Sequence, residues 1–363
     1  MKWKRILAMI LAVASCLSLA VSASAANTVT RKATDFKDYD RTAWYAEAVS
    51  AAVDNGLLYG KSSTVIDPNG AMTRAEMAAI INRSFGCYKT ADISQYKDVS
   101  KSAWYYKDVA LAVQMGTYNG RSSSAMAPDA PISRQEAMTV VARALELDYD
   151  AYAKTDLSKF ADRDKISAWA LPYIRAMVGA DYIHGRGKNL APLDNITRAE
   201  FAQIFANIIG SYITVKGSYD KDIKGSVLIR TDDVTLQNMT VDGDLIIGCG
   251  AADGKITLDN VTVKGRLLVW GGGTKAVYCN NGTNMPAVVV ARVDDAVKVI
   301  YDRDSTLAVI DTIKVRITER AKQHTETEVI FYDVSGLREA QKQLNAIVAD
   351  NQIALTAPAH LYA

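Results

Sequence analysis

The stretch MTRAEMAAI at residues 72–80 decides the fold, because it recurs twice in the same chain. Its counterparts are ISRQEAMTV at 132–140 and ITRAEFAQI at 196–204. Each copy places a hydroxyl residue, an arginine and a glutamate in the same order before an apolar stripe with helical spacing. A hydroxyl followed three residues later by a glutamate is the pattern of a capping box. Three helix starts of one kind predict three copies of one structural unit.

The copies share more than this helix start. In the first copy an aspartate, a tryptophan, two glycines and a proline precede Thr73, and the second copy repeats their spacing. The third copy keeps the order but has Asp181 in place of the first glycine. An apolar stripe of Val49, Ala52 and Val53 predicts a further helix ahead of the glycines. Two short amphipathic helices cannot bury both faces alone, so we expect three helix–loop–helix units to pack as one pseudo-threefold bundle.

The helix starts contain six capping residues and three arginines without a capping role. The capping pairs are Thr73 with Glu76, Ser133 with Glu136, and Thr197 with Glu200. The arginines are Arg74, Arg134 and Arg198. A cation in the first turn lies at the positive end of the helix dipole, which is unfavourable by roughly 0.3–1 kcal/mol. An anion suits this place better, because free backbone N–H groups and a guanidinium can hold a carboxylate together.

The loop between the two helices adds further polar residues to each unit. It carries a cation after its second glycine, and serines follow that cation in two of the units. The candidate loop residues are Lys61, Arg121, Arg186, Ser62 and Ser122. Together with the three arginines they predict an anion pocket that is used three times. The alternative is that these cations are solvated or neutralise the capping glutamates.

One tryptophan in each unit is a candidate for contact with a sugar. These residues are Trp44, Trp104 and Trp169. An indole offers a flat apolar face and one N–H donor, which suits stacking on a sugar ring. The alternative is that each tryptophan only packs at the start of the first helix.

The charge of the chain excludes several classes of partner. The formal net charge is +2, and residues 36–210 hold 20 Lys/Arg and 20 Asp/Glu. No overall field therefore favours nucleic acid or an acidic membrane surface, and an anion site must be built locally. The cysteines and histidines show no metal-ligand spacing, so we expect no metal and no cofactor. Cys249 and Cys279 are expected either to pair or to be free buried thiols.

The N-terminus indicates export. The opening MKWKR supplies cations, an apolar stretch follows, and SASAAN offers small residues for cleavage. This order is typical of a secretory signal peptide, which we place over residues 1–26. No later stretch reaches the roughly 20 apolar residues that cross a bilayer, so we expect an exported protein without a membrane span.

The second half of the chain changes from a helical to a short-strand pattern. VTLQNMTVDGDLIIG from Val234 aligns with ITLDNVTVKGRLLVWG from Ile256, a period of 22 residues. Alternating strands between Gly, Asp and Asn turns at this period predict a small parallel β-solenoid. Asn238 and Asn260 are expected to stack as an internal ladder. The tail is expected to hold strands and a helix that caps the open end.

The sequence thus predicts a multidomain α + β protein, with a pseudo-threefold helical module followed by a small β-rich, solenoid-like domain. The expected segments are a signal peptide at 1–26, repeats at 36–90, 96–150 and 158–212, a β-solenoid-like domain at 213–310 and a C-terminal strand and helix segment at 311–363.

The repeats resemble the S-layer homology family. The first copy carries this resemblance as FKDYDRTAW, GLLYG and DPNGAMTRAE, the second as YKDVSKSAW, GTYNG and APDAPISRQE, and the third more loosely. The resemblance covers residues 36–210 and implies binding of a secondary cell-wall polysaccharide linked to peptidoglycan, often through pyruvylated amino sugars. It further implies grooves between repeats in which the helix-start arginine faces an acidic ligand, here Arg74, Arg134 and Arg198.

From this resemblance we expect a secreted protein of the cell wall or S-layer of a Gram-positive-type envelope, without enzymatic activity. Its expected partners are the wall glycan and copies of itself or other S-layer proteins. The alternatives are an anchored carbohydrate-active enzyme or a surface adhesin that acts through the β domain. The aspartates of the second half speak against the enzyme, because only Asp242 aligns between coils and its counterpart is Lys264.

Overall fold

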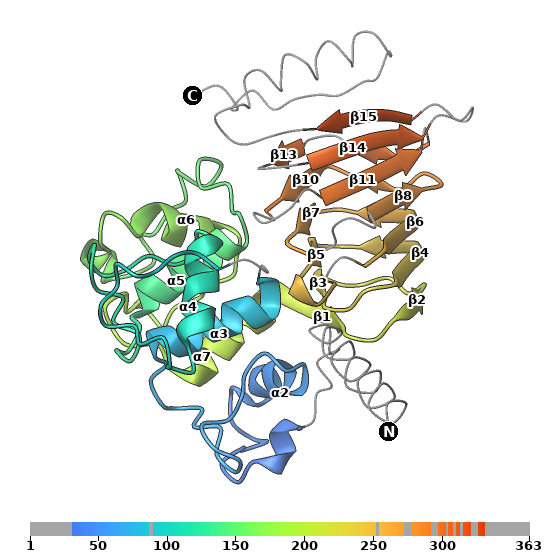
Figure 1. The fold of residues 1–363 in the computed structure, drawn as a ribbon. Coiled ribbons are helices and arrows are strands. Elements are labelled where there is room, and N and C mark those ends of the chain that lie inside the picture. Colours follow the sequence, from blue (N-terminus) through green and yellow to red (C-terminus); the bar gives the residue numbers. More distant parts are fainter. Residues whose placement is uncertain are drawn as a thin grey trace, which may run out of the picture.

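The computed structural model of the protein describes residues 31–330 with short gaps (Figure 1). The gaps are 87–89, 252–253, 272–276, 292–296, 303, 308–309, 313–314 and 321–325. The expected signal peptide, Cys87 and the helix expected in the tail lie outside the described residues. A helical region is followed by a stack of parallel strands, which confirms the predicted fold class.

Six α-helices make up the helical region among the described residues, two from each repeat. They are α2 (Ala46–Asp54), α3 (Arg74–Phe85), α4 (Tyr106–Gln114), α5 (Arg134–Ala144), α6 (Leu171–Gly179) and α7 (Arg198–Ile208), with 3₁₀ turns η1 (Ala33–Asp35) and η2 (Arg163–Lys165). All three predicted capping boxes are present at α3, α5 and α7. Asp181 follows α6 with φ 61°, as Gly56 follows α2 with φ 67°. Aspartate can replace glycine there because it tolerates the left-handed region better than most residues.

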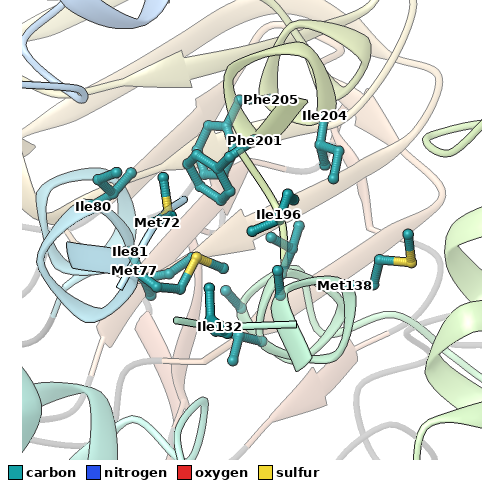
Figure 2. Packing of buried hydrophobic residues seen from close by; sticks show 14 of the residues in the cluster. Met72, Met77, Ile80, Ile81, Ile132, Met138, Ile196, Phe201, Ile204 and Phe205 are labelled. Atoms are coloured by element: carbon teal, nitrogen blue, oxygen red, sulfur yellow. The ribbon is translucent and has the colours of Figure 1, made fainter. Parts of the chain in front are cut away.

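Three backbone hydrogen bonds join the repeats in a ring. The amide of Met72 donates to Ile196 at 3.0 Å, that of Ile196 to Ile132 at 3.1 Å, and that of Ile132 to Met72 at 3.0 Å. All three side chains are fully buried, and Figure 2 shows them between the second helices. The third repeat therefore closes onto the first, as the predicted pseudo-threefold bundle requires.

The apolar stripes of the second helices fill the space around this ring. Figure 2 shows Met77 and Ile81 of α3 near Ile132, with Phe201 and Phe205 of α7 above them. The rings of Phe201 and Phe205 lie 4.8 Å apart between centroids. The predicted stripes are all buried and consist of Met77, Ile80, Ile81 and Phe85 in α3 and Phe201, Ile204, Phe205 and Ile208 in α7.

An aspartate near the start of each repeat fixes the loop between its helices. The carboxylate of Asp98 accepts the backbone N–H groups of Met126 and Ala127, at 2.9 and 2.6 Å. Asp38 and Asp162 do the same in their own repeats. Each carboxylate pairs with two backbone N–H groups that have no partner in a helix or strand. It thereby fixes the loop between the two helices of its repeat.

The strands form two parallel sheets that stack into a solenoid. One sheet has the order β1 (Ile209–Ile213), β3 (Ser226–Ile229), β5 (Leu245–Ile247), β7 (Arg266–Val269), β10 (Ala287–Val290) and β13 (Ile310–Thr312). The other contains β2 (Gly217–Tyr219), β4 (Val234–Val241), β6 (Ile256–Val263), β8 (Val277–Asn280), β9 (Asn284–Met285), β11 (Val297–Asp302), β12 (Thr306–Leu307), β14 (Val315–Arg320) and β15 (Glu326–Ile330). A 3₁₀ turn, η3 (Cys249–Ala251), follows β5. Only β15 pairs antiparallel, to β14, among the described strands.

The predicted register of the solenoid is confirmed, with one correction. Val234 pairs with Ile256, and the amides of Asn238 and Asn260 are hydrogen-bonded at 2.9 Å. The asparagine ladder is exposed, so the prediction that it is internal is wrong. Both asparagines have positive φ, 50° and 55°, in the middle of a strand. Each asparagine interrupts the alternation of its strand, so that the apolar residues on both sides of it are buried.

One sheet of the solenoid packs against the helical region. Strands β3, β5 and β7 are buried along nearly their whole length, which explains their continuous apolar runs. One set of their side chains faces the solenoid interior, while Leu228, Ile246 and Leu268 join the core of the helical region. The two halves of the chain therefore share a hydrophobic core.

Polar contacts tie the solenoid to the ends of two helices. Trp270 is fully buried and its indole N–H donates to the carbonyl of Ala144 at 2.7 Å. Arg266 donates to the carbonyls of Leu145 and Glu146, just after α5. Arg230 donates to the carbonyl of Asn55, which caps α2. These donors satisfy carbonyl groups that a helix leaves unpaired at its C-terminus.

Two further expectations concern the cysteines and membrane insertion. Cys279 is a free, fully buried thiol, and burial raises its pKa to about 12. The free-thiol alternative therefore holds for Cys279. Among the described residues, no helix has both the length and the hydropathy that a bilayer crossing needs.

Candidate functional site: three grooves between the repeats

Three grooves lie on the helical region, and all three repeats contribute to each. Groove 1 lies between residues 58–61, helix α3, Trp104 and Arg198, with a volume of about 360 Å³. Groove 2 lies between residues 117–121, helix α5, Trp169 and Arg74, with a volume of about 370 Å³. Groove 3 lies between residues 182–186, helix α7, Trp44 and Arg134, with a volume of about 270 Å³. Each groove thus has a loop and helix from one repeat, an arginine from the second and a tryptophan from the third.

The tryptophans are the exposed walls of the grooves. Trp44, Trp104 and Trp169 are 64%, 63% and 50% exposed. Trp44 and Trp104 each touch the following tyrosine edge to face, at 5.5 and 5.4 Å between ring centroids. An exposed indole held by one neighbour keeps a face free for a planar apolar ligand surface. Trp44 and Trp104 thus pack on a neighbour at the helix start, as the alternative expected, and they also leave at least half of the side chain exposed.

The helix-start arginines form the floor of the grooves. Arg74 is only 4% exposed, although it belongs to repeat 1 and reaches into repeat 2. Its Nε donates to the carbonyl of Met126 at 2.9 Å and its Nη2 to that of Asn119 at 2.8 Å. Its Nη1 pairs with Glu136 at 2.9 Å. A guanidinium has five N–H donors, so at least one remains for a ligand in groove 2.

The other two arginines repeat this pattern around the ring. Arg134 donates to the carbonyl of Leu190 at 3.0 Å and pairs with Glu200 at 3.2 Å. Arg198 donates to the carbonyls of Ile66 and Tyr59 and pairs with Glu76 at 3.4 Å. Burial lowers the pKa of Arg134 and Arg198, but an arginine remains charged in any case. The capping glutamates are therefore neutralised by arginines, and each arginine comes from another repeat.

The backbone N–H groups at the helix starts are not free. The amide of Arg74 donates to the carbonyl of Ala130 at 3.0 Å, and that of Ala75 to Pro128 at 2.8 Å. The amide of Glu76 donates to the capping hydroxyl. Equivalent bonds occupy the starts of α5 and α7. The expectation that these N–H groups hold an anion is wrong, because the packing of repeats uses them first.

The loop cations hold the same glutamates from the opposite side. Lys61 pairs with Glu76, Arg121 with Glu136 and Arg186 with Glu200. All three cations line their grooves. Each carboxylate therefore lies between two cations, one from its own repeat and one from another.

This arrangement controls the ionisation of two glutamates. Burial alone would raise the pKa of Glu136, but hydrogen bonds from Ser133 and Arg121 and the charge of Arg74 outweigh burial and lower it. Burial would also raise the pKa of Glu200, and the bonds from Arg186 and Thr197 lower it. Both glutamates are therefore charged at neutral pH.

The predicted serines do not line the grooves. The hydroxyl of Ser62 accepts the amide of Thr64 at 3.1 Å, and that of Ser122 accepts the amide of Ala125 at 3.1 Å. Neither serine belongs to the residues around groove 1 or groove 2. These hydroxyls close a local turn, which is a common role for serine in loops. The nine predicted cations and tryptophans, in contrast, all line grooves, three in each.

Sequence reasoning missed two groove arginines. Arg83 lines groove 1 and Arg143 lines groove 2, one turn or more beyond the helix starts. Arg83 donates to the carbonyl of Leu57 at 2.9 Å and lies 3.8 Å over the Tyr59 ring. Arg143 lies 4.8 Å over the Tyr173 ring. Neither forms an ion pair with a carboxylate of the described residues, so their positive charge is available in the grooves.

Comparison with known proteins identifies the repeats. The model of the S-layer homology domain matches residues 35–78, 95–138 and 159–202. A surface-layer 125 kDa protein of Lysinibacillus sphaericus is 34% identical over 49% of this chain and 15% of its own length.

Two further relatives differ in what they do. The S-layer protein sap of Bacillus anthracis is 23% identical over 53% of this chain, and an endoglucanase of Bacillus sp. (strain KSM-635) is 24% identical over 57%. These matches cover 24% and 22% of the two relatives. The chain therefore spans a quarter or less of the length of these three proteins.

Proposed function

Because this chain contains three S-layer homology domains, at residues 35–78, 95–138 and 159–202, we propose that it is a cell-surface protein anchored noncovalently to the cell wall. The three grooves bind an acidic secondary cell-wall polysaccharide, and its pyruvyl ketals supply the carboxylates. Residues 36–210 are the anchoring module and the solenoid is the part presented outward. The protein has no enzymatic role of its own.

The observation that carries the proposal is the pairing of an open indole with an unneutralised guanidinium in one groove. In groove 2, Trp169 and Arg143 meet these conditions, and in groove 1 Trp104 and Arg83 do. A pyranose ring offers an apolar face for the indole, and a carboxylate on that ring is what a free guanidinium binds best. A groove of about 360 Å³ also has the size of a site for one or two sugar residues.

The buried arginines support this site from below. Arg74 and Arg198 fix the loops that carry Asn119 and Tyr59, and they leave positive charge at the groove floor. The groove linings of grooves 1 and 2 each hold three cations against one carboxylate. In a partly desolvated groove this excess attracts an anion more strongly than the same charges would on the open surface. We propose that Arg74 and Arg198 contact the pyruvyl carboxylate from the groove floor.

The relatives favour anchoring over catalysis. S-layer proteins and an endoglucanase match this chain in a region that includes the repeats. A module shared by proteins of such different activity serves what they have in common, which is a place at the cell surface. In the solenoid, Asp242 pairs with Lys264 at 2.6 Å and Asp244 with Arg266 at 2.7 Å. Carboxylates held in such pairs are poorly suited to general acid catalysis, which needs a raised pKa.

A sedimentation assay with purified cell walls tests the proposal. Walls are prepared intact, after mild acid removal of pyruvyl ketals, and after complete extraction of the secondary polysaccharide. We expect the protein to sediment with intact walls and to lose at least about tenfold in affinity on ketal-free walls. Equal retention on extracted walls would refute the proposal.

A matched pair of variants identifies the grooves as the site. The double variant R83Q/R143Q removes two cations that have no carboxylate partner among the described residues, while R163Q/K165Q removes two exposed cations that line none of the three grooves. We expect R163Q/K165Q to bind intact walls like the wild type, and R83Q/R143Q to bind intact walls no more tightly than the wild type binds ketal-free walls. Equal loss in both variants would show that binding depends on net charge and not on the grooves.

A further inference from the structure

The three grooves differ at one helix position. The residue nine places after the helix-start arginine is Arg83 in groove 1, Arg143 in groove 2 and Asn207 in groove 3. The segments that match the S-layer homology domain end at residues 78, 138 and 202, before this position in every repeat. The difference therefore lies outside the segments that match this domain.

Groove 3 has no spare positive charge. Its lining holds two arginines, Arg134 and Arg186, against Glu200, and His184, which also lines it, lies 3.6 Å from a carboxylate oxygen of Asp181. Arg186 also pairs at 2.8 Å with Asp194, which lies outside the lining, so two carboxylates neutralise the two arginines. A carboxylate that entered this groove would lose its water without gaining an uncompensated cation, and such burial is unfavourable.

Neutral hydrogen-bonding groups occupy the place of the missing arginine. Gln203 donates to the Asn207 side chain at 2.9 Å, and Asn207 donates to the carbonyl of Tyr182 at 3.0 Å. Each of these amides keeps further donors or acceptors for a ligand. Trp44 still presents its exposed face, and the volume of about 270 Å³ is the smallest of the three. These features suit the hydroxyl and acetamido groups of an uncharged sugar.

From these contrasts we infer that different grooves bind chemically different sugar residues of the polysaccharide. Grooves 1 and 2 take the acidic sugar, and groove 3 takes an uncharged N-acetylhexosamine residue. Asn207 is the specificity-determining residue of groove 3. The inference rests on the proposed function, since it assigns ligand classes to grooves that are proposed to bind the wall glycan.

Each groove carries its own spectroscopic reporter. The indole N–H of Trp104 reports on groove 1, that of Trp169 on groove 2 and that of Trp44 on groove 3. Trp270 is buried in the contact between the helical region and the solenoid, so its indole signal reports only on folding. Apart from Trp3 in the expected signal peptide, the tryptophans of the ¹⁵N-labelled full chain therefore give one signal per groove and an internal control.

Two probes separate the ligand classes. One is a methyl glycoside of N-acetylmannosamine with a 4,6-pyruvyl ketal, and the other is the same glycoside without the ketal. We expect the acidic probe to shift the signals of Trp104 and Trp169 and to leave Trp44 in place. The neutral probe should shift Trp44. If the acidic probe shifts the Trp44 signal with the same titration midpoint as the Trp169 signal, the inference is overturned but the proposed function stands. If neither probe shifts any of the three signals, both are contradicted.

Reciprocal substitutions make the test decisive. N207R adds the missing cation, and we expect the signal of Trp44 to respond to the acidic probe in this variant. In R143N, the acidic probe should bind groove 2 at least about tenfold more weakly, as the titration midpoint of the Trp169 signal reports. The midpoint of the Trp104 signal in the same molecule should not change. An unchanged Trp270 signal establishes that either variant is folded. Failure of N207R to recruit the acidic probe in the folded protein would refute the role of Asn207.

Discussion

At the scale of single residues, the groove arginines of this protein are of two kinds, which differ in burial and in their carboxylate partners. Arg74 is buried and its guanidinium binds two carbonyls and Glu136 of the next repeat. Arg83 is half-buried, stacks on Tyr59 and has no carboxylate partner among the described residues. The first kind holds repeats together from the groove floor, where we propose that it also reaches the ligand, and the second kind offers the ligand a charge that no carboxylate of the described residues neutralises.

This division predicts that two alanine substitutions lower the stability by very different amounts. R74A removes one of the two cations that hold Glu136 and leaves the carbonyls of Met126 and Asn119 without their side-chain donor, so we expect the free energy of unfolding to fall by about 3–5 kcal/mol. R83A removes a partly solvated side chain and should cost about 1 kcal/mol or less. Urea unfolding followed by circular dichroism measures both. Equal destabilisation in the two variants would contradict the distinction.

The sequence pointed to the buried arginines and not to the half-buried ones, for a physical reason. Arg74 lies at a helix start, where a cation is unfavourable and therefore conspicuous. Arg83 and Arg143 lie near the ends of α3 and α5, where a cation is favourable with respect to the dipole and looks like an ordinary solvated residue. Their role emerges only when another repeat places its tryptophan opposite them.

At the scale of elements, the start of each second helix is a junction between repeats. Its capping box satisfies the local N–H groups, and its glutamate receives one cation from its own loop and one from another repeat. The capping boxes and the 22-residue register could be predicted because both are local or strictly periodic patterns. Which arginine meets which glutamate could not, since the three copies are equivalent in sequence and only the closed ring decides the partner.

The ionisation of these junctions predicts acid sensitivity. The pKa values of Glu136 and Glu200 lie below their ordinary value of 4.5 in the folded protein. Their contribution to stability is therefore complete above about pH 4.5 and is lost as the pH falls toward the folded pKa. Urea unfolding from about pH 6 to about pH 3 should show this loss, and E136Q should reduce its steepness. An identical pH profile in E136Q would rule out a contribution from this carboxylate.

At the scale of the whole molecule, the helical region and the solenoid form one cooperative structure. Strands β3, β5 and β7 place Leu228, Ile246 and Leu268 in the core of the helical region. The carbonyls at the ends of α2 and α5 accept donors from Arg230, Arg266 and Trp270. Sequence patterns predict each half separately, because a strand buried on both faces does not reveal what covers its outer face.

Removal of the buried tryptophan should uncouple the two halves. W270A leaves a large cavity and an unpaired carbonyl at Ala144, so we expect a loss of about 3–5 kcal/mol. Differential scanning calorimetry of the wild type should show one transition, and W270A should show two. W104A is the matched control, because that tryptophan is exposed and its loss should leave the single transition unchanged. Two transitions already in the wild type would show that the halves unfold independently.

The closed backbone ring of Met72, Ile132 and Ile196 limits how this anchor can evolve. A linear array of repeats loses one site when it loses one unit, and gains one when a unit is duplicated. Here every groove draws on three repeats, so deletion of any single repeat removes all three grooves at once. A fourth repeat would find no vacant neighbour to dock on. Tighter attachment therefore requires a second complete set of three repeats or a second molecule, either of which adds affinity through multivalency.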